Sequence, residues 1–365
     1  MKKMKDENLF TDIYKLKEKL YGIDKVESII ELVGEVEDSI ENNSIPKKIR
    51  YLLLKTTNYC NSDCEYCSHA LNRVPKEEKY SIPYEIIMHT IEEAAEMGVD
   101  AISISGGEPL IRSDIIDIIS KCVECKIIPV LLTNGLLLKQ KWDELGEAGL
   151  RYLIISMDSV NKQIYEKQRG ADFDMAIAGI QAALRMREQY NDLEIHVSAV
   201  LTKDNQDDFF ELLKYMNSRR IKVQISPYHK REDDVEDYSL VERDKALKLA
   251  KKLIAMKRDG YLIANSDAFL MHLPDFFCSN KVMPKNFKCK VGYTSLAIDT
   301  YMNVKPCWSY MYEPVGNLKY STLKELWYSD KMHYYREKMM RSECEGCWYL
   351  CTSETCMMLE SVLGG

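Results

Sequence analysis

Three cysteines, Cys60, Cys64 and Cys67, are spaced so that their thiolates can bind one metal centre. This C-x3-C-x2-C loop supplies three sulfur ligands, one fewer than a four-iron cluster needs for full protein ligation. A cluster bound there keeps one iron open for a ligand that does not come from the protein. The open iron is where chemistry is expected.

The same spacing permits a second kind of metal site, a structural zinc ion. Zinc normally takes four ligands, and the loop offers three thiolates. His69, two residues beyond the last cysteine, can supply a fourth, although a loop histidine is more often a solvated side chain. An iron–sulfur cluster with an open iron is therefore favoured over zinc.

A second motif follows about 40 residues later, at the end of another apolar run. Residues 100–105 are predicted to form a β-strand that leads directly into Gly106, Gly107 and Glu108. Two adjacent glycines permit a close approach of the backbone, and the carboxylate beside them can accept hydrogen bonds from an ammonium group. The cysteine loop likewise follows a predicted strand, at 49–55.

These two motifs resemble those of the radical S-adenosylmethionine (SAM) superfamily. The resemblance implies that the three loop cysteines hold a [4Fe–4S] cluster, whose fourth iron takes the amino and carboxylate groups of the methionine moiety. Tyr66 matches the aromatic residue near the adenine, and residues 106–108 match the contacts to the methionine amine. The implied reaction is reductive cleavage of SAM to a 5′-deoxyadenosyl radical, which abstracts a substrate hydrogen.

Strand-like and helix-like stretches alternate between residues 49 and 228. Such alternation is typical of parallel βα units, and six units make an incomplete barrel. We predict an α/β fold, a partial TIM-like (β/α)6 barrel, with both motifs at the C-terminal ends of strands, where such barrels carry their active sites. Strands are predicted at 49–55, 100–105, 127–132, 151–156, 194–201 and 222–226, and helices at 83–97, 112–125, 139–148, 174–190 and 206–218.

The fourth predicted strand ends at Ser156, and Arg169 follows a short helical segment. Many relatives with additional clusters have a Ser-Leu-Asp motif at this strand end and an arginine about a dozen residues later; here Met157 replaces the leucine. The resemblance implies that Ser156 hydrogen-bonds the ribose and that Arg169 binds the methionine carboxylate. Without this resemblance, the sequence would predict a strand-end turn at Ser156 and a surface ion pair for Arg169.

The last segment, 278–365, is rich in cysteine. Cys289 and Cys307 bracket a predicted hairpin, and Cys344 and Cys347 follow as a C-x2-C pair. This arrangement resembles the twitch and SPASM extensions of radical SAM enzymes, and it implies one auxiliary [4Fe–4S] cluster on these four cysteines. The hairpin arms are predicted at 294–299 and 303–305.

The segment departs from the full SPASM pattern. Met302 stands where a hairpin glycine is usual, the spacings after Cys347 are three and four residues, and no further cysteine follows Cys356 in the sequence. A second auxiliary cluster would draw on Cys278, Cys351 and Cys356, which are one thiolate short of full ligation. One or two auxiliary clusters are thus both open, and zinc remains an alternative because C-x2-C pairs also occur in zinc ribbons.

Other reactive residues carry weaker signals. Cys122 and Cys125 form a C-x2-C pair, but they are predicted to lie one turn apart on a helix, where buried or idle thiols are expected. Proton loss after hydrogen abstraction calls for a general base. Tyr228, His229 and Tyr310 are candidates by position alone.

Composition limits the class of protein. The 365 residues carry a net charge of −7, which argues against a nucleic-acid groove. The longest apolar runs are short of a membrane span, and the charged N-terminus shows no signal-peptide pattern. Twelve cysteines in metal-like spacings within a large chain favour a reducing compartment, so a soluble cytoplasmic protein is expected.

Four segments are predicted along the chain. They are an N-terminal helical cap (1–48, with helices at 8–20 and 25–41), the barrel (49–228), a helical linker (229–277) and the auxiliary cluster domain (278–365).

Relatives with such a tail modify peptides by cross-linking, epimerisation or oxidation, and a smaller set oxidises sugars or cyclitols. A peptide substrate and an electron donor such as flavodoxin or ferredoxin are therefore expected, with a small-molecule dehydrogenase as the alternative. Two other classes stay open, a non-catalytic iron–sulfur electron carrier and a zinc-stabilised binding module. The carrier would need the clusters but no open iron.

Overall fold

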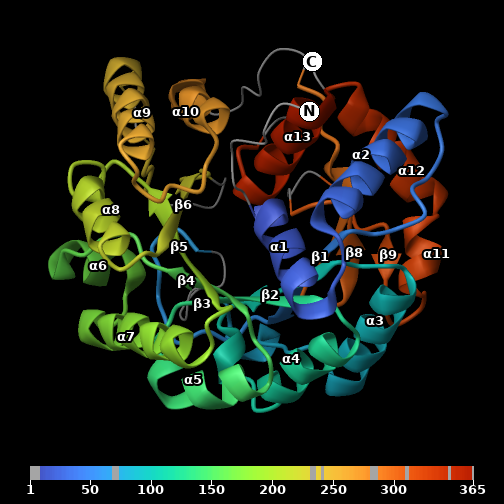
Figure 1. Ribbon diagram of the computed structural model, residues 1–365, viewed down its shortest axis with the longest axis horizontal. Coiled ribbons are helices and arrows are strands. Elements are labelled where there is room, and N and C mark those ends of the chain that lie inside the picture. The colour runs from blue at the N-terminus through green and yellow to red at the C-terminus, as the bar shows by residue number, and fades with distance from the viewer. Residues whose placement is uncertain are drawn as a thin grey trace.

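A computed structural model describes residues 9–67, 74–230, 236–239, 242–279, 287–308, 312–343 and 347–363. Its centre is a nine-stranded sheet in the order β6-β5-β4-β3-β2-β1-β7-β8-β9, which curves into an arch without closing (Figure 1). Neighbours from β6 to β7 are parallel, whereas β8 and β9 are antiparallel additions. The strands are β1 (Tyr51–Thr57), β2 (Ala101–Gly106), β3 (Ile128–Thr133), β4 (Tyr152–Ser156), β5 (Glu194–Leu201), β6 (Lys222–Pro227), β7 (Ser295–Ile298), β8 (Asn303–Lys305) and β9 (Gly316–Asn317).

Both faces of the sheet are covered, which explains why the central strands are mostly apolar. In β1, Leu52 and Leu54 belong to the core beneath the outer helices, whereas Tyr51 and Leu53 pack on the inner side of the arch. Side chains alternate between the two faces, so one strand supplies both cores. The outer helices are α3 (Tyr84–Glu96), α4 (Ile115–Glu124), α5 (Leu138–Glu147), α6 (Lys162–Arg169), α7 (Phe173–Gln189) and α8 (Phe209–Asn217) (Figure 1).

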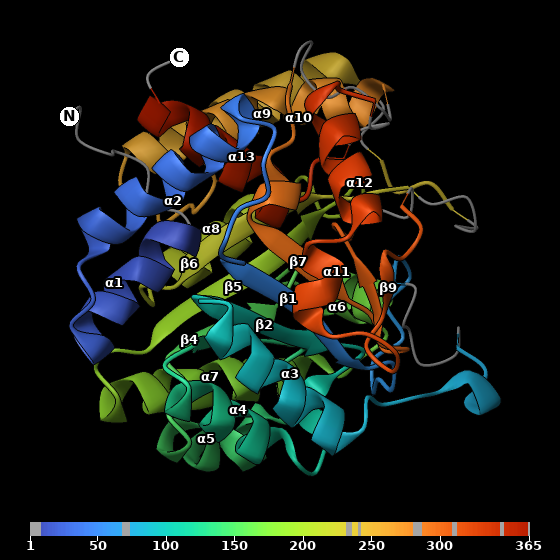
Figure 2. The ribbon, with the colours of Figure 1, turned by 90° about the vertical axis from the view of Figure 1, so that its right-hand side faces the viewer.

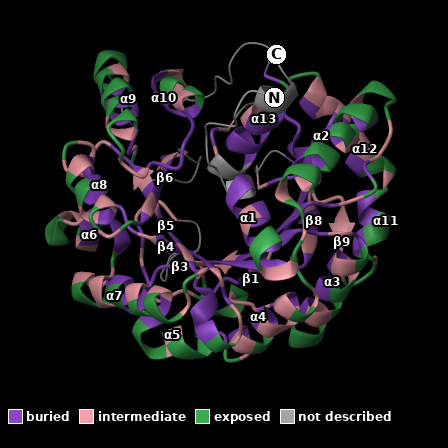
Figure 3. Cartoon of the chain, in the orientation of Figure 1, coloured by how far each residue is buried: buried purple, intermediate pink, exposed green. Residues whose placement is uncertain are grey.

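The N-terminal helices α1 (Leu9–Tyr21) and α2 (Lys25–Glu41) lie inside the arch. Ile13 and Tyr14 of α1 are each 1% exposed and join a core with residues at the N-terminal ends of the strands. Helix α1 is mostly buried and α2 buries one face, so the pair packs into the end of the barrel opposite the predicted mouth and is not only a solvated cap (Figure 3).

Two further helices, α9 (Arg243–Arg258) and α10 (Asp267–Ser279), cover the edge beside β6 (Figure 1). The loop between them pairs with this edge strand. The Asn265 side chain accepts a hydrogen bond from the Ile225 amide at 2.7 Å and donates to the Ile225 carbonyl at 2.8 Å. The segment predicted as a linker therefore continues the hydrogen bonding of the sheet.

The tail also joins the sheet, because β7 pairs in parallel with β1 (Figure 2). The predicted hairpin is confirmed as β7 and β8, and Met302 at its turn has a φ of +67°, in the left-handed region that favours glycine. The remaining helices are α11 (Leu323–Trp327), α12 (Asp330–Met340) and α13 (Leu350–Leu363). Met358 and Leu359 of α13 return to the core inside the arch.

Within the described residues, no helix is both long enough and apolar enough to cross a lipid bilayer.

Candidate functional site

The Gly-Gly-Glu motif lies directly against the start of the cysteine loop. The Gly107 amide donates to the Thr57 carbonyl at 2.7 Å, and the Glu108 amide donates to the Tyr59 carbonyl at 2.7 Å. A Cβ atom on Gly106 or Gly107 would stand 2.2 Å from the carbonyl oxygen of Thr57 or Tyr59, respectively. Gly106 also has a φ of +143°. Both glycines are needed because two backbones meet here without room for a side chain.

The loop cysteines are sheltered from solvent, with Cys64 buried and Cys60 and Cys67 partly buried. The thiols of Cys60, Cys64 and Cys67 interact electrostatically, and burial raises the pKa of Cys60 to about 11 and that of Cys64 to about 12. Neutral thiols are therefore the stable form at pH 7 without a metal. A bound metal centre would supply the positive charge that makes them thiolates.

The donor set of the loop tests which metal centre it fits. A structural zinc ion normally takes four ligands, and the loop offers three thiols. A four-iron cluster held by three thiolates keeps one iron open for another ligand, so the loop fits such a cluster. His69 lies outside the described residues.

Glu108 follows β2 in the sequence, and its fully buried carboxylate lies against the end of β3. It accepts hydrogen bonds from the Leu110 amide (2.9 Å), the Thr133 hydroxyl (2.8 Å) and the Asn134 amide (2.7 Å). Burial raises the pKa of Glu108 to about 7 despite these donors. The Asn134 side chain also donates to Ser62 in the cysteine loop at 2.9 Å. The Gly-Gly-Glu motif did not reveal Thr133 and Asn134 as partners, because they lie 25 and 26 residues further along the chain, where β3 ends.

A buried ion pair stands at the end of β4. The Arg169 guanidinium donates to both oxygens of Asp158, at 2.6 and 2.8 Å, and the Val200 amide donates to the same carboxylate at 2.7 Å. The Tyr66 hydroxyl makes a short hydrogen bond to Asp158 as well. This network brings Tyr66 and Arg169 together, and the arginine lies in a buried pair instead of on the surface. Ser156 is half-buried at the same strand end.

Helix α6 seats this arginine against the cysteine loop. The Gln168 carbonyl accepts a hydrogen bond from the Glu65 amide at 3.0 Å. Gly170 ends the helix with a φ of +51°, and a Cβ atom there would lie 2.7 Å from the Asp63 carbonyl oxygen. The glycine therefore permits the helix end to touch the loop.

In the tail, Cys289, Cys307 and Cys356 share one buried cluster. A hydrogen bond with Cys356, together with burial, raises the pKa of Cys289. The Lys290 amide donates to the Cys356 sulfur at 3.1 Å, an interaction that would favour a thiolate. Cys356, which the sequence assigned to an optional second cluster, therefore lies with the hairpin pair.

The other tail cysteines are less fully defined. Cys347 is half-buried, and its sulfur lies 3.4 Å from the Thr352 hydroxyl. Cys344 lies outside the described residues, and the side chains of Cys278 in α10 and Cys351 in α13 are not described. The set of Cys289, Cys307, Cys344 and Cys347 stays a prediction.

Cys122 and Cys125 have the surroundings of structural thiols and not of metal ligands. Cys122 is fully buried in the core beneath α4, where burial raises its pKa, and Cys125 follows the helix. A neutral thiol packed among aliphatic side chains behaves as a small apolar residue.

His229 joins the end of β6 to the tail. Its Nδ1 lies 2.9 Å from the Pro227 carbonyl oxygen, and its Nε2 accepts a hydrogen bond from the Trp348 amide at 3.0 Å. The ring stacks on Tyr349 at a centroid distance of 3.8 Å. Both nitrogens are occupied, so His229 positions the segment after Cys347 and is a poor general base. Tyr310, another candidate base, lies outside the described residues.

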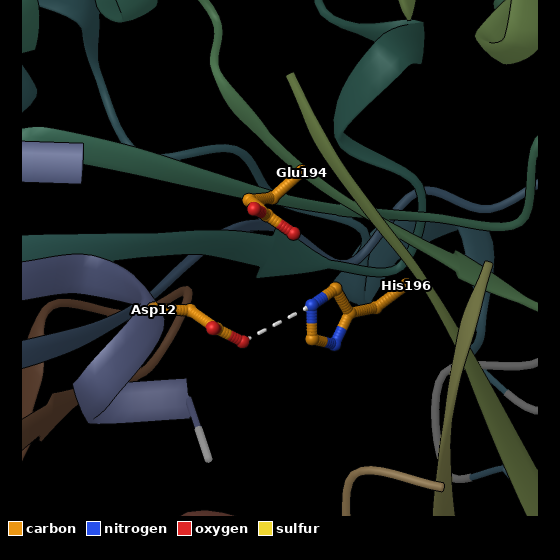
Figure 4. Close-up of side chains that lie close together, drawn as sticks. All are labelled: Asp12, Glu194 and His196. Atoms are coloured by element: carbon orange, nitrogen blue, oxygen red, sulfur yellow. Dashed lines mark ion pairs between the residues drawn. The ribbon is translucent and has the colours of Figure 1, made fainter. Parts of the chain in front are cut away.

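A third polar cluster lies at the opposite end of the barrel (Figure 4). Asp12, Glu194 and His196 bring three possible ligand atoms within 4.8 Å of one another. However, the Lys222 ammonium lies 2.9 Å from both carboxylate oxygens of Asp12. Burial alone would raise the pKa of Asp12, but its interactions with His196 and Lys222 hold that pKa below its usual range. A cation from the chain already fills this site, which fixes α1 to β5 and β6.

Two family models match the chain. The radical SAM superfamily model matches residues 54–216, and the SPASM model, described as an iron–sulfur cluster-binding domain, matches residues 289–348. The first match contains the cysteine loop and the Gly-Gly-Glu motif, and the second contains the hairpin cysteines.

Curated relatives match a shorter part of the chain. A GTP 3′,8-cyclase from Peptoclostridium acidaminophilum is 33% identical over 195 residues, which are 48% of this chain and 59% of that protein. A probable GTP 3′,8-cyclase from Methanocaldococcus jannaschii is 28% identical over 225 residues, 60% of this chain and 74% of that protein. The chain thus spans only 59% of the length of the first of these relatives.

Solved structures match most of the chain. SuiB from Streptococcus suis bound to S-adenosylmethionine aligns with a TM-score of 0.64 at 18% identity, over 86% of this chain and 73% of SuiB. The enzyme anSMEcpe with bound AdoMet and Cp18Cys peptide aligns with a TM-score of 0.61 at 19% identity, over 83% of this chain and 87% of that one. These likenesses confirm the predicted fold.

The two family matches also confirm the predicted cofactors, which are S-adenosylmethionine, the [4Fe–4S] cluster that binds it, and auxiliary iron–sulfur clusters. The motifs that meet at the strand ends and the cysteine-rich tail thus have one explanation: this chain belongs to the radical SAM superfamily and carries a C-terminal SPASM domain.

Proposed function

We propose that this chain is a radical SAM maturase that abstracts a hydrogen atom from a peptide, leading to oxidation, cross-linking or epimerisation. The observation that carries the proposal is the shared architecture of barrel, hairpin and tail. It aligns over 83–86% of the chain with two structures whose reported complexes include a precursor peptide and a Cp18Cys peptide.

The assignment of residues to the SAM site is part of the proposal. Cys60, Cys64 and Cys67 would hold the cluster, and Glu108 would accept the methionine amine. Each oxygen of a carboxylate has two lone pairs, so the donors already bound to Glu108 leave acceptor capacity. The backbone of Gly106 and Gly107 would lie beside the same amine.

The other side of the proposed site comes from β4 and α6. Tyr66 would lie against the adenine, and Ser156 would hydrogen-bond the ribose. Arg169 would reach the methionine carboxylate with a guanidinium donor, while Asp158 keeps the rest of the guanidinium fixed. A fixed fork loses little side-chain entropy on binding.

The auxiliary site is proposed to centre on Cys289, Cys307 and Cys356, because these three thiols are buried together. A remaining ligand would come from the pair Cys344 and Cys347. A second cluster would then use Cys278 and Cys351 with whichever of that pair is left.

When bound, the reduced cluster and SAM supply a 5′-deoxyadenosyl radical that takes a hydrogen from an unactivated carbon. The chain binds and orients the reactants and excludes water from them. The inner core formed by α1, α2 and α13 fills the end of the barrel where the strands begin. A substrate would therefore approach from the C-terminal ends of the strands. A flavodoxin or ferredoxin would supply the electron.

The test is anaerobic reconstitution with iron and sulfide, followed by measurement of 5′-deoxyadenosine after reduction. We expect the wild-type protein to form it, and the variant Cys60→Ala/Cys64→Ala/Cys67→Ala to lose it together with about four irons. Cys122→Ala is the matched control and should keep both. A protein that binds the clusters but never cleaves SAM would be an electron carrier.

A nucleotide substrate is the second candidate, because the curated relatives with 28–33% identity are GTP 3′,8-cyclases. The same assay separates the two substrates. Faster 5′-deoxyadenosine formation with GTP, together with deuterium transfer from labelled GTP, would support the nucleotide and contradict the peptide proposal.

A further inference from the structure

The tail hairpin reaches the cysteine loop through a tyrosine at its turn. Because β7 pairs with β1 in register, with Ile298 opposite Leu54, the turn that follows β7 stands beside the residues that follow β1 (Figure 2). Tyr301 lies in this turn, between β7 and β8, and is 45% exposed. It belongs to neither of the proposed metal sites.

The hydroxyl of Tyr301 meets the side chain of Asn58, two residues before Cys60. The Asn58 Nδ2 donates to the Tyr301 hydroxyl oxygen at 3.2 Å and to the Glu78 carbonyl at 3.0 Å. The Tyr301 hydroxyl donates in turn to the same Glu78 carbonyl at 3.0 Å. A ring of hydrogen bonds therefore closes between the hairpin, the start of the cysteine loop and segment 78–81, and the hydroxyl acts in it as both donor and acceptor.

Asn58 is also held on its other sides, and the residue is only 2% exposed. Its Oδ1 accepts a hydrogen bond from the Tyr80 amide at 2.6 Å, and its own amide donates to the Tyr80 carbonyl at 3.0 Å. An asparagine side chain has two donor hydrogens. Loss of the Tyr301 hydroxyl would take the protein partner from one of them, and a buried donor without its partner is costly.

Tyr301 is itself fixed in the hairpin before it meets Asn58. Its amide donates to the Asp299 Oδ1 at 2.9 Å, and its carbonyl accepts from the Asn317 Nδ2 at 2.9 Å. Its ring stacks on Tyr80, with 6.1 Å between ring centroids and 23° between the ring planes. A side chain held in this way loses little freedom when it forms its hydrogen bonds, so it can keep its partner in one place.

The part of the cysteine loop that Asn58 fixes is its first turn. The next residue, Tyr59, accepts a hydrogen bond from the Glu108 amide at 2.7 Å through its carbonyl, and Cys60 follows directly. The place of the Cys60 sulfur thus depends on two anchors, the Gly-Gly-Glu motif and the tail hairpin. A site whose supporting residues are loose binds its ligand poorly even when the binding residues are present.

We propose that Tyr301 is a positioning residue for the SAM site, because it holds Cys60 in place through Asn58. The tail would then contribute to cofactor binding without contacting the cofactor. This inference rests on the proposed assignment of Cys60, Cys64 and Cys67 to the cluster. The alternative is that Tyr301 only fastens the hairpin, so that its loss would change stability and not the loop.

The test compares Tyr301→Phe with Tyr328→Phe as a matched control. Tyr328 is 39% exposed, and its hydroxyl also joins the tail to the rest of the chain, by donating to the Lys47 carbonyl at 3.3 Å. Lys47 precedes β1, whereas the cysteine loop follows it. Both variants keep the ring and lose one hydroxyl, so we expect similar melting temperatures for the two apoproteins.

The first measurement is SAM binding to the reconstituted protein by equilibrium dialysis, without reductant, so that no SAM is cleaved. We expect Tyr301→Phe to raise the dissociation constant about fivefold, as for the loss of one ordinary hydrogen bond, with the iron content unchanged. Tyr328→Phe should bind SAM as the wild type does.

The second measurement needs no cluster. The apoprotein is treated with iodoacetamide, and alkylation of each cysteine is followed by mass spectrometry. We expect Cys60 to react several-fold faster in Tyr301→Phe than in the wild type, because the start of the loop is less firmly held. Cys125, partly buried at the end of α4, is the internal control and should react at the same rate in all three proteins.

Equal SAM affinity and equal Cys60 alkylation in Tyr301→Phe and the wild type would overturn the inference, as would the same changes in Tyr328→Phe. Failure of the proposed function has a different result: the wild-type protein itself would bind no SAM. Faster alkylation without any SAM binding would mean that Tyr301 holds a loop with another role, which also contradicts the inference. Neither measurement contains a substrate, so a nucleotide substrate would not change the outcome.

Discussion

Asp158 is the residue that holds the β4 side of the proposed site together. Its carboxylate is completely buried and accepts hydrogen bonds from Arg169, Val200 and Tyr66. In a barrel of parallel strands, one acidic side chain at a strand end can thus orient groups from three elements. The ion pair of Asp158 and Arg169 contributes more by fixing the geometry of the site than by its electrostatic attraction, because burying two charges is itself costly.

Removal of this charge gives a first prediction. Asp158→Asn would leave the Arg169 guanidinium buried without a counter-charge, and we expect a loss of about 3–5 kcal/mol in the free energy of unfolding. Thermal unfolding of the apoprotein measures it. Asp174→Asn removes an exposed ion pair with Lys162 and should cost less than about 1 kcal/mol. Similar losses in both variants would contradict the role assigned to burial.

Cys356 gives a second prediction at the same scale. If it shares a cluster with Cys289, the variants Cys356→Ala and Cys289→Ala should each lose about four irons per chain and show the same change in the electron paramagnetic resonance spectrum of the reduced protein. Cys125→Ala should keep the full iron content. Retention of all iron by Cys356→Ala would place this thiol outside the cluster.

The sequence indicated which residue types act as ligands better than it indicated which of those residues lie together. The spacing of Cys60, Cys64 and Cys67 is local, and three residues on one loop must meet. Cys356 is 49 residues beyond Cys307, and nothing in the spacing shows that α13 turns back to the hairpin. The pairing of Glu108 with β3 is equally non-local.

At the scale of elements, His229 connects β6 to the tail. His229→Phe would keep the stacking on Tyr349 but lose both hydrogen bonds, at a cost of about 1–3 kcal/mol. We expect weaker retention of auxiliary iron during gel filtration, while the loop cluster is kept. His272→Phe is a suitable control, because His272 packs on the same Trp348 ring through its edge. Equal iron loss in the two variants would argue against a positioning role.

The same histidine predicts a pH dependence. Burial lowers the pKa of His229 to about 4, well below the value of about 6.5 expected in an unfolded chain. The unfolded state therefore binds the proton more readily, so this residue's contribution to stability is complete above pH 6.5 and declines as the pH falls toward 4. The melting temperature of the wild-type apoprotein should fall more steeply in this range than that of His229→Phe. Parallel curves would contradict the burial of a neutral ring.

The Asp12 carboxylate is one of the groups that fix helix α1 to the sheet. Asp12→Asn should cost about 2–3 kcal/mol, because Lys222 loses its counter-charge and His196 loses its carboxylate partner at the barrel end. Since the pKa of Asp12 is lowered in the fold, its contribution is present above its usual value of 3.8 and disappears as the pH falls further. The difference from wild type should therefore be largest near neutral pH. Glu147→Gln on α5, an exposed site, is the control for urea unfolding.

The elements themselves were unequally predictable. All six barrel strands and their helices follow from apolar runs and alternation, with ends shifted by a few residues. Helix α10 contains Pro274 and is apolar on several sides, so no amphipathic stripe marks it. Helix α13 presents buried polar residues, and its Glu354 accepts a hydrogen bond from the Ser266 amide at 2.8 Å. Such polar side chains form hydrogen bonds inside the protein, whereas the sequence pattern alone would place them on the surface.

For the whole molecule, the cofactor should act as a stabilising ligand only when the loop cluster is present. At 100 times its dissociation constant, a ligand that binds the folded state alone adds about 2.7 kcal/mol. SAM should therefore raise the melting temperature of the reconstituted protein and leave the apoprotein nearly unchanged. An equal shift in both would show that the open iron contributes little to binding.

The parallel pairing of β7 with β1 has a consequence for dividing this protein. A shortened chain that ends before residue 287 would leave β1 as an exposed edge strand, because Tyr51 to Leu54 would lose their four partner residues in β7. An apolar edge strand with unpaired backbone amides promotes self-association. The two regions that the family models match are therefore not independent folding units, and a fusion or a divided chain should keep the pairing of β1 with β7 intact.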